Sequence, residues 1–341
     1  MSILQWIQQE LHPVMCNSVE FFYDEMESQS DFSLPIIYQP YDPHNRSHWA
    51  DRGSLFDFLF STCGSTCTDK TLLDFGPGDG WPSLNVAPYV KEVIGVDGSH
   101  RRVKVCQENA RRLGINNARF IYVEPGARLP FAEFSFDGVM AASSLEQTPD
   151  PRMTLSELYR VLRPEGRLRI SYESLSRYRN CAEQAADLSQ ASGGGCWLTI
   201  YHRQVKAEQA DMLRLKFNLP VKVLRQAFEN ASDEHLFTHL TPERLIALKS
   251  ALITAKHCTL NHPFSRTLAS WMQQAGFRII IPTHSGEDFA QKYFDALERS
   301  ALPVNLAGVD SHLRLAVKVV SKLPAPYGDE KFPDPMLTAI K

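Results

Sequence analysis

The sequence predicts an α/β protein built on a doubly wound, mostly parallel sheet, with N-terminal helices and a helical insertion. Three observations predict this class. An apolar run from Thr71 to Phe75 leads directly into glycines at positions 76, 78 and 80. A second apolar run ends in Asp97, 21 residues after Gly76. Strand-like and helix-like segments then alternate, which is typical of a parallel sheet covered on both faces.

Composition limits the class of protein. A chain of 341 residues is long enough for a large α/β core with a sizeable insertion. The net charge of −3 gives no reason to expect nucleic acid as a partner. Seven cysteines, an odd number, are not expected to form a disulfide framework. Cys63 and Cys67 lack the second pair of cysteines that a zinc site would need, so we expect no metal. No run reaches the length of a membrane span and the N-terminus does not resemble a signal peptide, which favours a cytoplasmic protein without a membrane partner.

Residues 1–65 are expected to form an N-terminal helical segment. Apolar residues recur at helical spacing up to Leu11. Between residues 31 and 50, prolines bias the chain toward extended structure and turns. This stretch concentrates rings that are unusual for a plain linker: Tyr38, Tyr41, His44 and Trp49. One interpretation is that these rings only pack the N-terminal helices onto the sheet.

The stretch from Leu72 to Pro82 is expected to form a strand, a glycine turn and a helix. Closely spaced glycines let the backbone bend sharply and approach a ligand without a Cβ in the way. Pro82 suits a first helical turn, and a helix start offers free N–H groups. The spacing is G-x-G-x-G, which differs from the G-x-G-x-x-G of dinucleotide-binding domains.

The segments after Asp97 predict the rest of the parallel sheet. Ser99 is placed to cap a helix that runs to about Leu113 and ends at Gly114. Further strands are expected over residues 118–123, 136–141 and 166–172, with a helix over 152–162. A carboxylate at position 97 would accept hydrogen bonds from both ribose hydroxyls of a nucleoside that lies across the glycine turn.

The character of the chain changes past Ser174. We expect residues 175–260 to be a helical insertion, with a helix or helix pair over 205–230 split at Pro220 and another helix from Pro242 to about Lys256. Residues 261–322 would complete the core, with a last strand over 312–320. The proline-rich tail, 323–341, is expected to be a loosely packed arm.

Four linked motifs resemble the class I S-adenosylmethionine-dependent methyltransferases over residues 70–173. The glycine turn and the run that ends in Asp97 resemble motif I and the acidic motif after it. The remaining matches are Arg128–Phe131 with Phe134–Asp137, the loop Ser144–Pro151 and the turn Val161–Leu168. The resemblance implies a Rossmann-like, seven-stranded sheet, a cofactor-binding core over 66–174 and S-adenosylmethionine as the cofactor.

The resemblance also implies the cofactor-binding residues. Asp74 would lie near the amino group of the methionine part, Gly76 and Gly78 under the ligand, and Asp97 on the ribose. Because Pro125 stands where the family often has an acid, adenine would be recognised through Gly126, Ala127 or Glu124. In the family the segment before motif I often folds over the cofactor as a lid, a role that Tyr41 and Trp49 would take. The expected set is completed by Gly80, Gly98 and Ser143.

Candidate catalytic residues are fewer, because methyl transfer is an in-line displacement that mainly needs positioning and exclusion of water. Glu146 follows the fourth strand at the edge where open α/β sheets bind ligands, as a substrate contact or base. The alternative is a carboxylate at a helix start. His202 follows an apolar run in the insertion and would line a pocket, unless it is a structural histidine. Arg169, in the middle of a strand, needs a partner or a water-filled cleft.

The sequence therefore predicts methyl transfer from S-adenosylmethionine to a small-molecule acceptor, with the insertion as a cap that selects the substrate. Two alternatives stay open. The altered segment Glu124–Pro125 leaves room for a non-catalytic cofactor-binding or scaffold protein. A nicotinamide-dependent oxidoreductase fits less well, because the glycine spacing and the later motifs differ. The sequence does not fix the acceptor or the oligomeric state.

Overall fold

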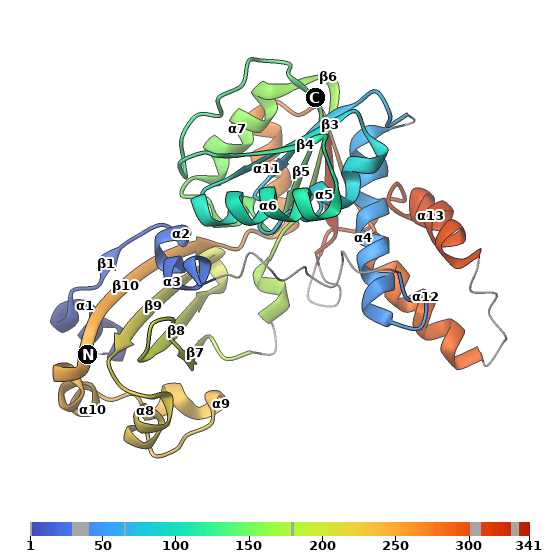
Figure 1. The fold of residues 1–341 in the computed structure, drawn as a ribbon. Helices are drawn as coiled ribbons and strands as arrows, with labels where there is room; N and C mark the ends of the chain where they lie inside the picture. Colours follow the sequence, from blue (N-terminus) through green and yellow to red (C-terminus); the bar gives the residue numbers. More distant parts are fainter. Residues whose placement is uncertain (1, 29–40, 65, 179–180, 301–307, 329–333) are drawn as a thin grey trace. The chain divides into compact units, whose positions relative to one another are not determined.

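The computed structural model describes residues 2–28, 41–64, 66–178, 181–300, 308–328 and 334–341 (Figure 1). The chain divides into two compact units. The insertion unit consists of residues 2–28, 147–149 and 177–263, and the core unit contains the rest of the described residues.

A seven-stranded sheet organises the core unit, in the order β11-β12-β6-β5-β2-β3-β4. Its strands are β2 (Thr71–Phe75), β3 (Glu92–Asp97), β4 (Ala118–Tyr122), β5 (Phe136–Ala142), β6 (Leu162–Ser171), β11 (Ile279–Thr283) and β12 (Met336–Ile340). The first five are parallel, and β12 runs antiparallel to both β6 and β11. The predicted doubly wound, mostly parallel Rossmann-like sheet is confirmed.

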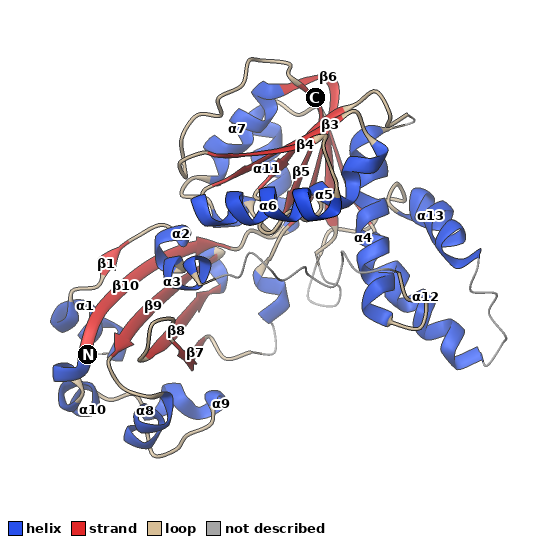
Figure 2. Ribbon diagram, in the orientation of Figure 1, coloured by secondary structure: helices blue, strands red, loops and turns tan. Residues whose placement is uncertain are grey.

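Helices cover both faces of this sheet (Figure 2). Along β2 the side chains alternate, so Leu73 packs in the cluster of α7 (Pro151–Val161) and α11 (Ser265–Ala275), while Leu72 packs in the cluster of α4 (Arg46–Cys63). The α4 face also carries α5 (Ser83–Val86) and α6 (His100–Leu113). As predicted, the Ser99 hydroxyl caps α6 and the left-handed Gly114 ends it.

Two more helices, α12 (Gly286–Ser300) and α13 (Val309–Val320), pack on α4. The approach of α12 to α4 requires glycine on both sides. A Cβ on Gly53 would lie 2.3 Å from the Gly286 oxygen, and a Cβ on Gly286 would lie 2.5 Å from the Gly53 oxygen. The backbones therefore meet directly where the two helices cross.

Arg169, the charge expected to need a partner or a cleft, is fully buried on β6 and paired with Asp57 of α4. One guanidinium nitrogen, Nη2, lies 2.6 Å from Asp57 Oδ1 and 2.8 Å from Oδ2. The other, Nη1, donates to the hydroxyls of Thr283 and Thr338. Asp57 Oδ2 also accepts from the Gly286 N–H at 2.6 Å. This polar network joins α4, β6, β11, β12 and the start of α12 inside the core.

The C-terminal residues overturn the prediction of a loosely packed arm. Residues 336–340 form β12, which lies between β6 and β11, and its Leu337 and Ala339 are fully buried. The prolines before this strand hid its short apolar pattern. Residues 312–320, predicted as the last strand, belong to helix α13. Leu313 and Val317 of α13 face the core four residues apart, as on one side of a helix.

The insertion unit overturns the prediction of a helical insertion. It is built on a five-stranded sheet, β1-β10-β9-β8-β7, antiparallel except for the β1–β10 pair. Its strands are β1 (Val14–Met15), β7 (Gln184–Gln190), β8 (Cys196–Gln204), β9 (Gln209–Phe217) and β10 (Leu252–Asn261). Short helices follow β9: α8 (Val221–Ala227), α9 (Asp233–Leu236) and α10 (Pro242–Ala247).

The physical reason is that both faces of this sheet are buried, so buried residues occupy both sets of alternate positions along a strand. On β8, Leu198 and Ile200 face an apolar cluster, while the alternate residues Trp197 and Thr199 are also buried, on the other face. Arg214 of β9 lies on that second face, 4.5 Å from the centre of the Trp197 ring. A strand buried on both faces lacks the polar alternation that distinguishes it from a helix.

The N-terminal helices belong to the insertion unit, which corrects the boundary predicted at residue 65. These helices are α1 (Ile3–Leu11), α2 (Ser18–Phe21) and α3 (Tyr23–Glu27). Trp6 and Ile7 of α1 pack in the apolar cluster of the five-stranded sheet. β1 then pairs with β10 in parallel. Helical spacing in the sequence identified α1 but could not show which sheet it covers.

Candidate functional site

The glycine turn after β2 is built from left-handed backbone conformations. The φ angles are +76° at Gly76, +60° at Gly78 and +111° at Gly80. A Cβ on Gly76 would lie 2.4 Å from the Ser144 Cβ, whereas a Cβ on Gly78 would meet nothing within 4 Å. Gly76 therefore lets the turn pack on the loop after β5, while Gly78 presents backbone to open space, where a ligand can approach closely.

Asp74 lies under this turn and is fully buried. Its Oδ2 accepts from the Ser83 hydroxyl at 2.6 Å and from the Ser83 N–H at 3.1 Å. Its Oδ1 is buried without a hydrogen-bond partner among the described residues. Burial raises the pKa of Asp74 to about 7. The position predicted for the methionine amino group thus holds a carboxyl oxygen that is available to a cationic donor.

Asp97 holds the turn in place at the end of β3. Its Oδ2 accepts from the Gly78 N–H at 3.2 Å and its Oδ1 from the Ser99 N–H at 2.9 Å, so Gly98 lies between two anchored residues. Burial raises the pKa of this carboxyl, against these hydrogen bonds. The acid predicted for the ribose therefore lies directly against the glycine predicted for the ligand floor.

The residues predicted for the adenine side follow the neighbouring strand. Val123 donates to the Asp97 carbonyl at 3.0 Å, and Ala127 closes a turn on the Glu124 carbonyl at 2.9 Å, with Gly126 at φ +82°. Gly126 and Ala127 are exposed. Ser143, at the end of β5, has a left-handed φ of +49° and donates its N–H to the Ser171 carbonyl at 2.8 Å. These backbone segments lie at the carboxyl edge of the sheet.

Sequence reasoning missed three residues of the cradle formed by Asp74, the glycine turn and Asp97. Ser83 fixes Asp74, and Ser144 packs on Gly76 and donates to the Phe75 carbonyl at 2.5 Å. Asn109 of α6 donates to the Asp79 carbonyl at 2.9 Å, and its Oδ1 is buried without a partner among the described residues. Sequence spacing gives little signal for these contacts, which link residues up to 69 apart.

Trp81, noted for its bulk after the third glycine, packs edge-on against Phe58 with ring centres 5.6 Å apart. Its indole N–H is buried without a partner within the described part of the chain. The predicted helix after the turn is α5, which has four residues. The polarity of the turn therefore depends on its own N–H groups more than on a helix dipole.

The rings predicted before the core lie in different surroundings, and His44 is exposed. Trp49 is 1% exposed and lies edge-on against Tyr293 and Phe294 of α12, so it is not a lid residue. Tyr41 is half-buried, with the Arg52 guanidinium 5.3 Å from its ring centre. Burial raises the pKa of Tyr41. Tyr38 lies outside the described residues. A cofactor contact by Tyr41 stays a prediction.

The two candidate catalytic residues belong to different units. Glu146 is 2% exposed, and its Oε1 accepts from the Glu173 N–H at 2.8 Å, which ties the loop after β5 to the end of β6. His202 lies on β8 of the insertion unit, with its Nε2 3.4 Å from Glu183 Oε1. A joint role for the two in catalysis stays a prediction.

Metals and membranes were considered for the described residues only. Among them, no group of three or more His, Cys, Asp or Glu side chains is placed to hold a metal ion. None of the helices in the described ranges combines the length and apolar character needed to cross a membrane.

Comparisons with known proteins match one region of the chain, in the core unit. Residues 73–170 match the family described as "Methyltransferase domain". The uncharacterized methyltransferase YcgJ of Bacillus subtilis is 36% identical over 99 residues, which are 29% of this chain and 39% of that protein. The 27-O-demethylrifamycin SV methyltransferase of Amycolatopsis mediterranei is 32% identical over 98 residues, 28% of this chain and 36% of that protein. The chain therefore matches well under half the length of these two relatives.

A solved structure resembles a larger part of the chain. The CcbJ methyltransferase from Streptomyces caelestis aligns over 90% of this chain and 98% of its own, with 13% identity and a TM-score of 0.49. A likeness of that size carries no argument about function.

Proposed function

Residues 73–170 belong to the class I S-adenosylmethionine-dependent methyltransferases, and on this premise we propose that the whole chain transfers a methyl group from S-adenosylmethionine to a small-molecule acceptor. The observation that carries the proposal is Asp74 Oδ1, a buried carboxyl oxygen without a partner among the described residues, beside a glycine turn that leaves open space at Gly78. The relative that acts on a rifamycin supports a small-molecule acceptor.

The residues of the cradle fit this cofactor. Asp74 would accept from the ammonium of the methionine part, and burial strengthens that charge pairing. Asp97 already accepts two backbone N–H groups, and a carboxylate retains further lone pairs for ribose hydroxyls. When bound, the sulfonium supplies an activated methyl group on a good leaving group. Asn109 Oδ1 and the Trp81 N–H, both buried without a partner in the part of the chain that the structure describes, add an acceptor and a donor close to the turn.

In this proposal, acceptor binding is assigned to two parts of the chain. Glu146 contacts the acceptor or takes its proton, from the loop after β5 at the carboxyl edge of the sheet. The insertion unit selects the substrate, and His202 contributes from β8. The family match covers residues 73–170, so residues 177–263 of the insertion unit lie outside it.

Calorimetric titration separates this function from the two alternatives. We expect S-adenosylhomocysteine to bind and NAD not to bind. Release of S-adenosylhomocysteine during incubation with S-adenosylmethionine and a panel of hydroxyl, amine and thiol acceptors then tests turnover. Binding of NAD alone would favour an oxidoreductase. Cofactor binding without turnover on any acceptor would favour the non-catalytic alternative.

A further inference from the structure

Two cysteines meet at the edge of the sheet opposite the glycine turn. Cys63 is the last residue of α4, and Cys67 lies in the loop that leads to the first residue of β2, whereas the glycine turn follows the last residue of β2. Each thiol lies close enough to the other to influence its ionisation. Cys63 is buried at 6% exposure, and Cys67 is half-buried against the same apolar cluster. Cys67 is therefore the more exposed residue of the pair.

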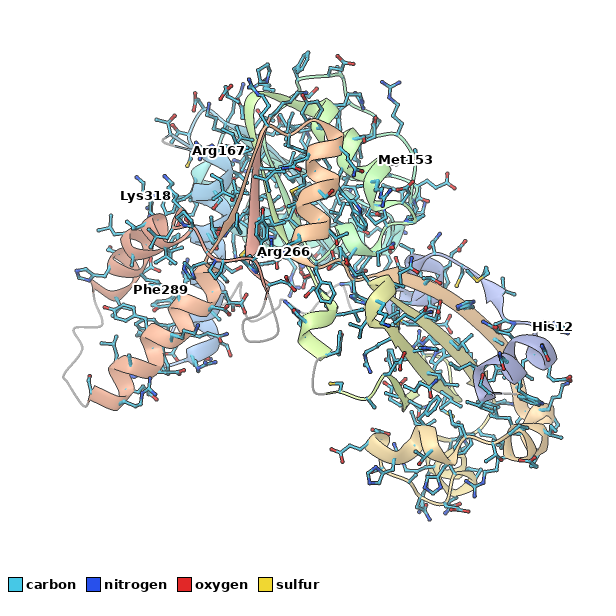
Figure 3. The ribbon with its side chains drawn as sticks, turned by 180° about the vertical axis from the view of Figure 1, so that it is seen from behind. His12, Met153, Arg167, Arg266, Phe289 and Lys318 are labelled. Carbon is cyan, nitrogen blue, oxygen red and sulfur yellow. The ribbon has the colours of Figure 1, made fainter. Side chains whose placement is uncertain are left out.

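Cations from two segments lie near the pair. Arg314 and Lys318 of α13 lie over the ring of Phe60, one turn before Cys63, at 5.7 Å and 5.5 Å from its centre. The Arg167 guanidinium carbon lies 3.7 Å from the position of a Cβ on Gly64. Figure 3 labels Arg167 and Lys318 on the same flank of the core unit.

The remaining charges near the pair are of both signs. Lys70 lies 3.9 Å from the largely exposed Asp69 and 3.7 Å from Asp137, so its charge is partly balanced. Burial, followed by the charges of Arg167 and Lys318, lowers the pKa of Lys322. That effect indicates how closely the cations are gathered here. The net local charge favours an anion at the more exposed thiol.

The pKa of Cys67 is lowered and that of Cys63 is raised, which makes the more exposed thiol the better nucleophile for disulfide exchange. The hydrogen bond from Cys63, with support from Arg314 and Lys318, lowers the pKa of Cys67 against the effect of burial. The same hydrogen bond and burial raise the pKa of Cys63. The more exposed sulfur is thus the better source of thiolate, and thiolate is the form that attacks disulfides.

We propose that Cys63 and Cys67 form a redox-active dithiol that exchanges with small-molecule disulfides. The Cys67 thiolate attacks one sulfur of the disulfide, which forms a mixed disulfide and releases one thiolate. Cys63 then loses its proton and attacks the Cys67 sulfur, which closes the Cys63–Cys67 disulfide and releases the second thiolate. The small disulfide is reduced by two electrons, and the protein dithiol is oxidised by two.

The other cysteines provide internal controls. Cys181 is exposed, and Cys16 is half-buried with a pKa that burial raises. Cys106, Cys196 and Cys258 are buried, and burial raises the pKa of each thiol. An exposed single thiol such as Cys181 would hold the mixed disulfide, because it has no second thiol placed to displace it. A dithiol is therefore distinguished from a single thiol because its mixed disulfide forms and is then lost.

The test uses the full chain and 5,5′-dithiobis(2-nitrobenzoate), with peptide mapping. In the native protein, Cys63 and Cys67 should release two thionitrobenzoate ions and end linked to each other without label. Cys63→Ser, with Cys63→Ala as a second variant in case serine disturbs the buried site, should release one ion from Cys67 and keep the label there. Cys67→Ser should remove the fast phase, and Cys181→Ser should leave it unchanged.

The effect of the neighbouring cations on Cys67 is tested by its reaction rate and by the pH dependence of that rate. Cys67 should react at least about tenfold faster than Cys181 at neutral pH, because a larger fraction is thiolate. Arg314→Gln together with Lys318→Gln should move the pH midpoint of the fast phase upward, and Arg111→Gln, on the exposed face of α6, should not. The proposal is overturned if label stays on Cys67 in the native protein, if the Cys63 variants trap no adduct, or if Cys67 reacts no faster than Cys181.

Discussion

At the scale of single residues, Asp74 shows burial competing with ionisation. The carboxyl is fully buried, two hydrogen bonds from Ser83 favour its charged form, and desolvation nevertheless raises its pKa to about 7. An unfolded Asp ionises near pH 4. Between pH about 4 and 7 the folded protein therefore binds a proton that the unfolded chain has released, so the free energy of unfolding decreases as pH rises through this window.

Ligand binding should reverse the preference of Asp74, because an ammonium group favours the charged carboxylate. We expect the affinity for S-adenosylhomocysteine to rise by up to about tenfold per pH unit below the pKa, and to level off above pH about 7. Calorimetry in buffers with different ionisation enthalpies should show proton release on binding at pH 6. Asp74→Asn should bind weakly with no such pH dependence. An unchanged pH profile in Asp74→Asn would remove Asp74 from the site.

Gly78 allows a test with a matched control. Gly78 and Gly114 are both left-handed, at φ +60° and +67°, and a Cβ on either meets nothing within 4 Å. Valine at either position should lower the free energy of unfolding by a similar amount, about 1–2 kcal/mol. Gly78→Val should also abolish binding of S-adenosylhomocysteine, because its side chain fills the open space of the turn. Equal binding by the two variants would place the ligand elsewhere.

At the scale of secondary-structure elements, the Arg169–Asp57 pair links one helix to three strands of the sheet. Arg169→Met leaves Asp57 as an uncompensated buried charge, and we expect a loss of about 3–5 kcal/mol in the free energy of unfolding, measured by urea denaturation. The double variant Arg169→Met, Asp57→Asn should recover part of that loss. The control is Arg163→Met, on the same strand as Arg169, which removes a partly exposed ion pair with Asp137 of β5. This variant should lower the free energy of unfolding by about 1 kcal/mol or less.

The C-terminal strand gives a second prediction at this scale. Leu337 of β12 is fully buried between β6 and β11, so Leu337→Ala should cost about 2–5 kcal/mol. Leu323→Ala, at a position 47% exposed, should change the free energy of unfolding by less than about 0.5 kcal/mol. Similar small effects from both variants would return the C-terminus to the role of an arm.

At the scale of the whole molecule, the chain combines a cofactor-binding core unit with an insertion unit built around a separate sheet. Hydrogen exchange on the full chain should show that S-adenosylhomocysteine protects residues 74–99 and leaves the insertion unit unchanged. An acceptor found by the turnover screen should then protect strands β8 and β9. Protection confined to the core unit under both conditions would contradict substrate selection by the insertion unit.

Local sequence patterns predicted the elements of the core unit between residues 71 and 171. Its strands are short apolar runs bounded by glycine, proline and a capping serine, and these signals act over a few residues. Gly78 and Asp97 were predicted from local spacing and Asp74 from the family resemblance, and the structure places Gly78 and Asp97 in direct contact. Local patterns suffice where each strand is followed by its own helix, because neighbouring elements then pack in chain order.

The remaining elements depend on contacts between residues that are far apart in the sequence. β12 pairs with β6, about 170 residues earlier in the chain. Leu337 is buried by the strands on either side of β12, which the local sequence of β12 does not reveal. The strands of the insertion unit are buried on both faces, so the alternation that separates strand from helix is lost from their sequence. Arg169 was expected to need a partner or a water-filled cleft, and Asp57, 112 residues away, supplies that partner. Burial and pairing across such separations are properties of the folded chain, which no local window of sequence contains.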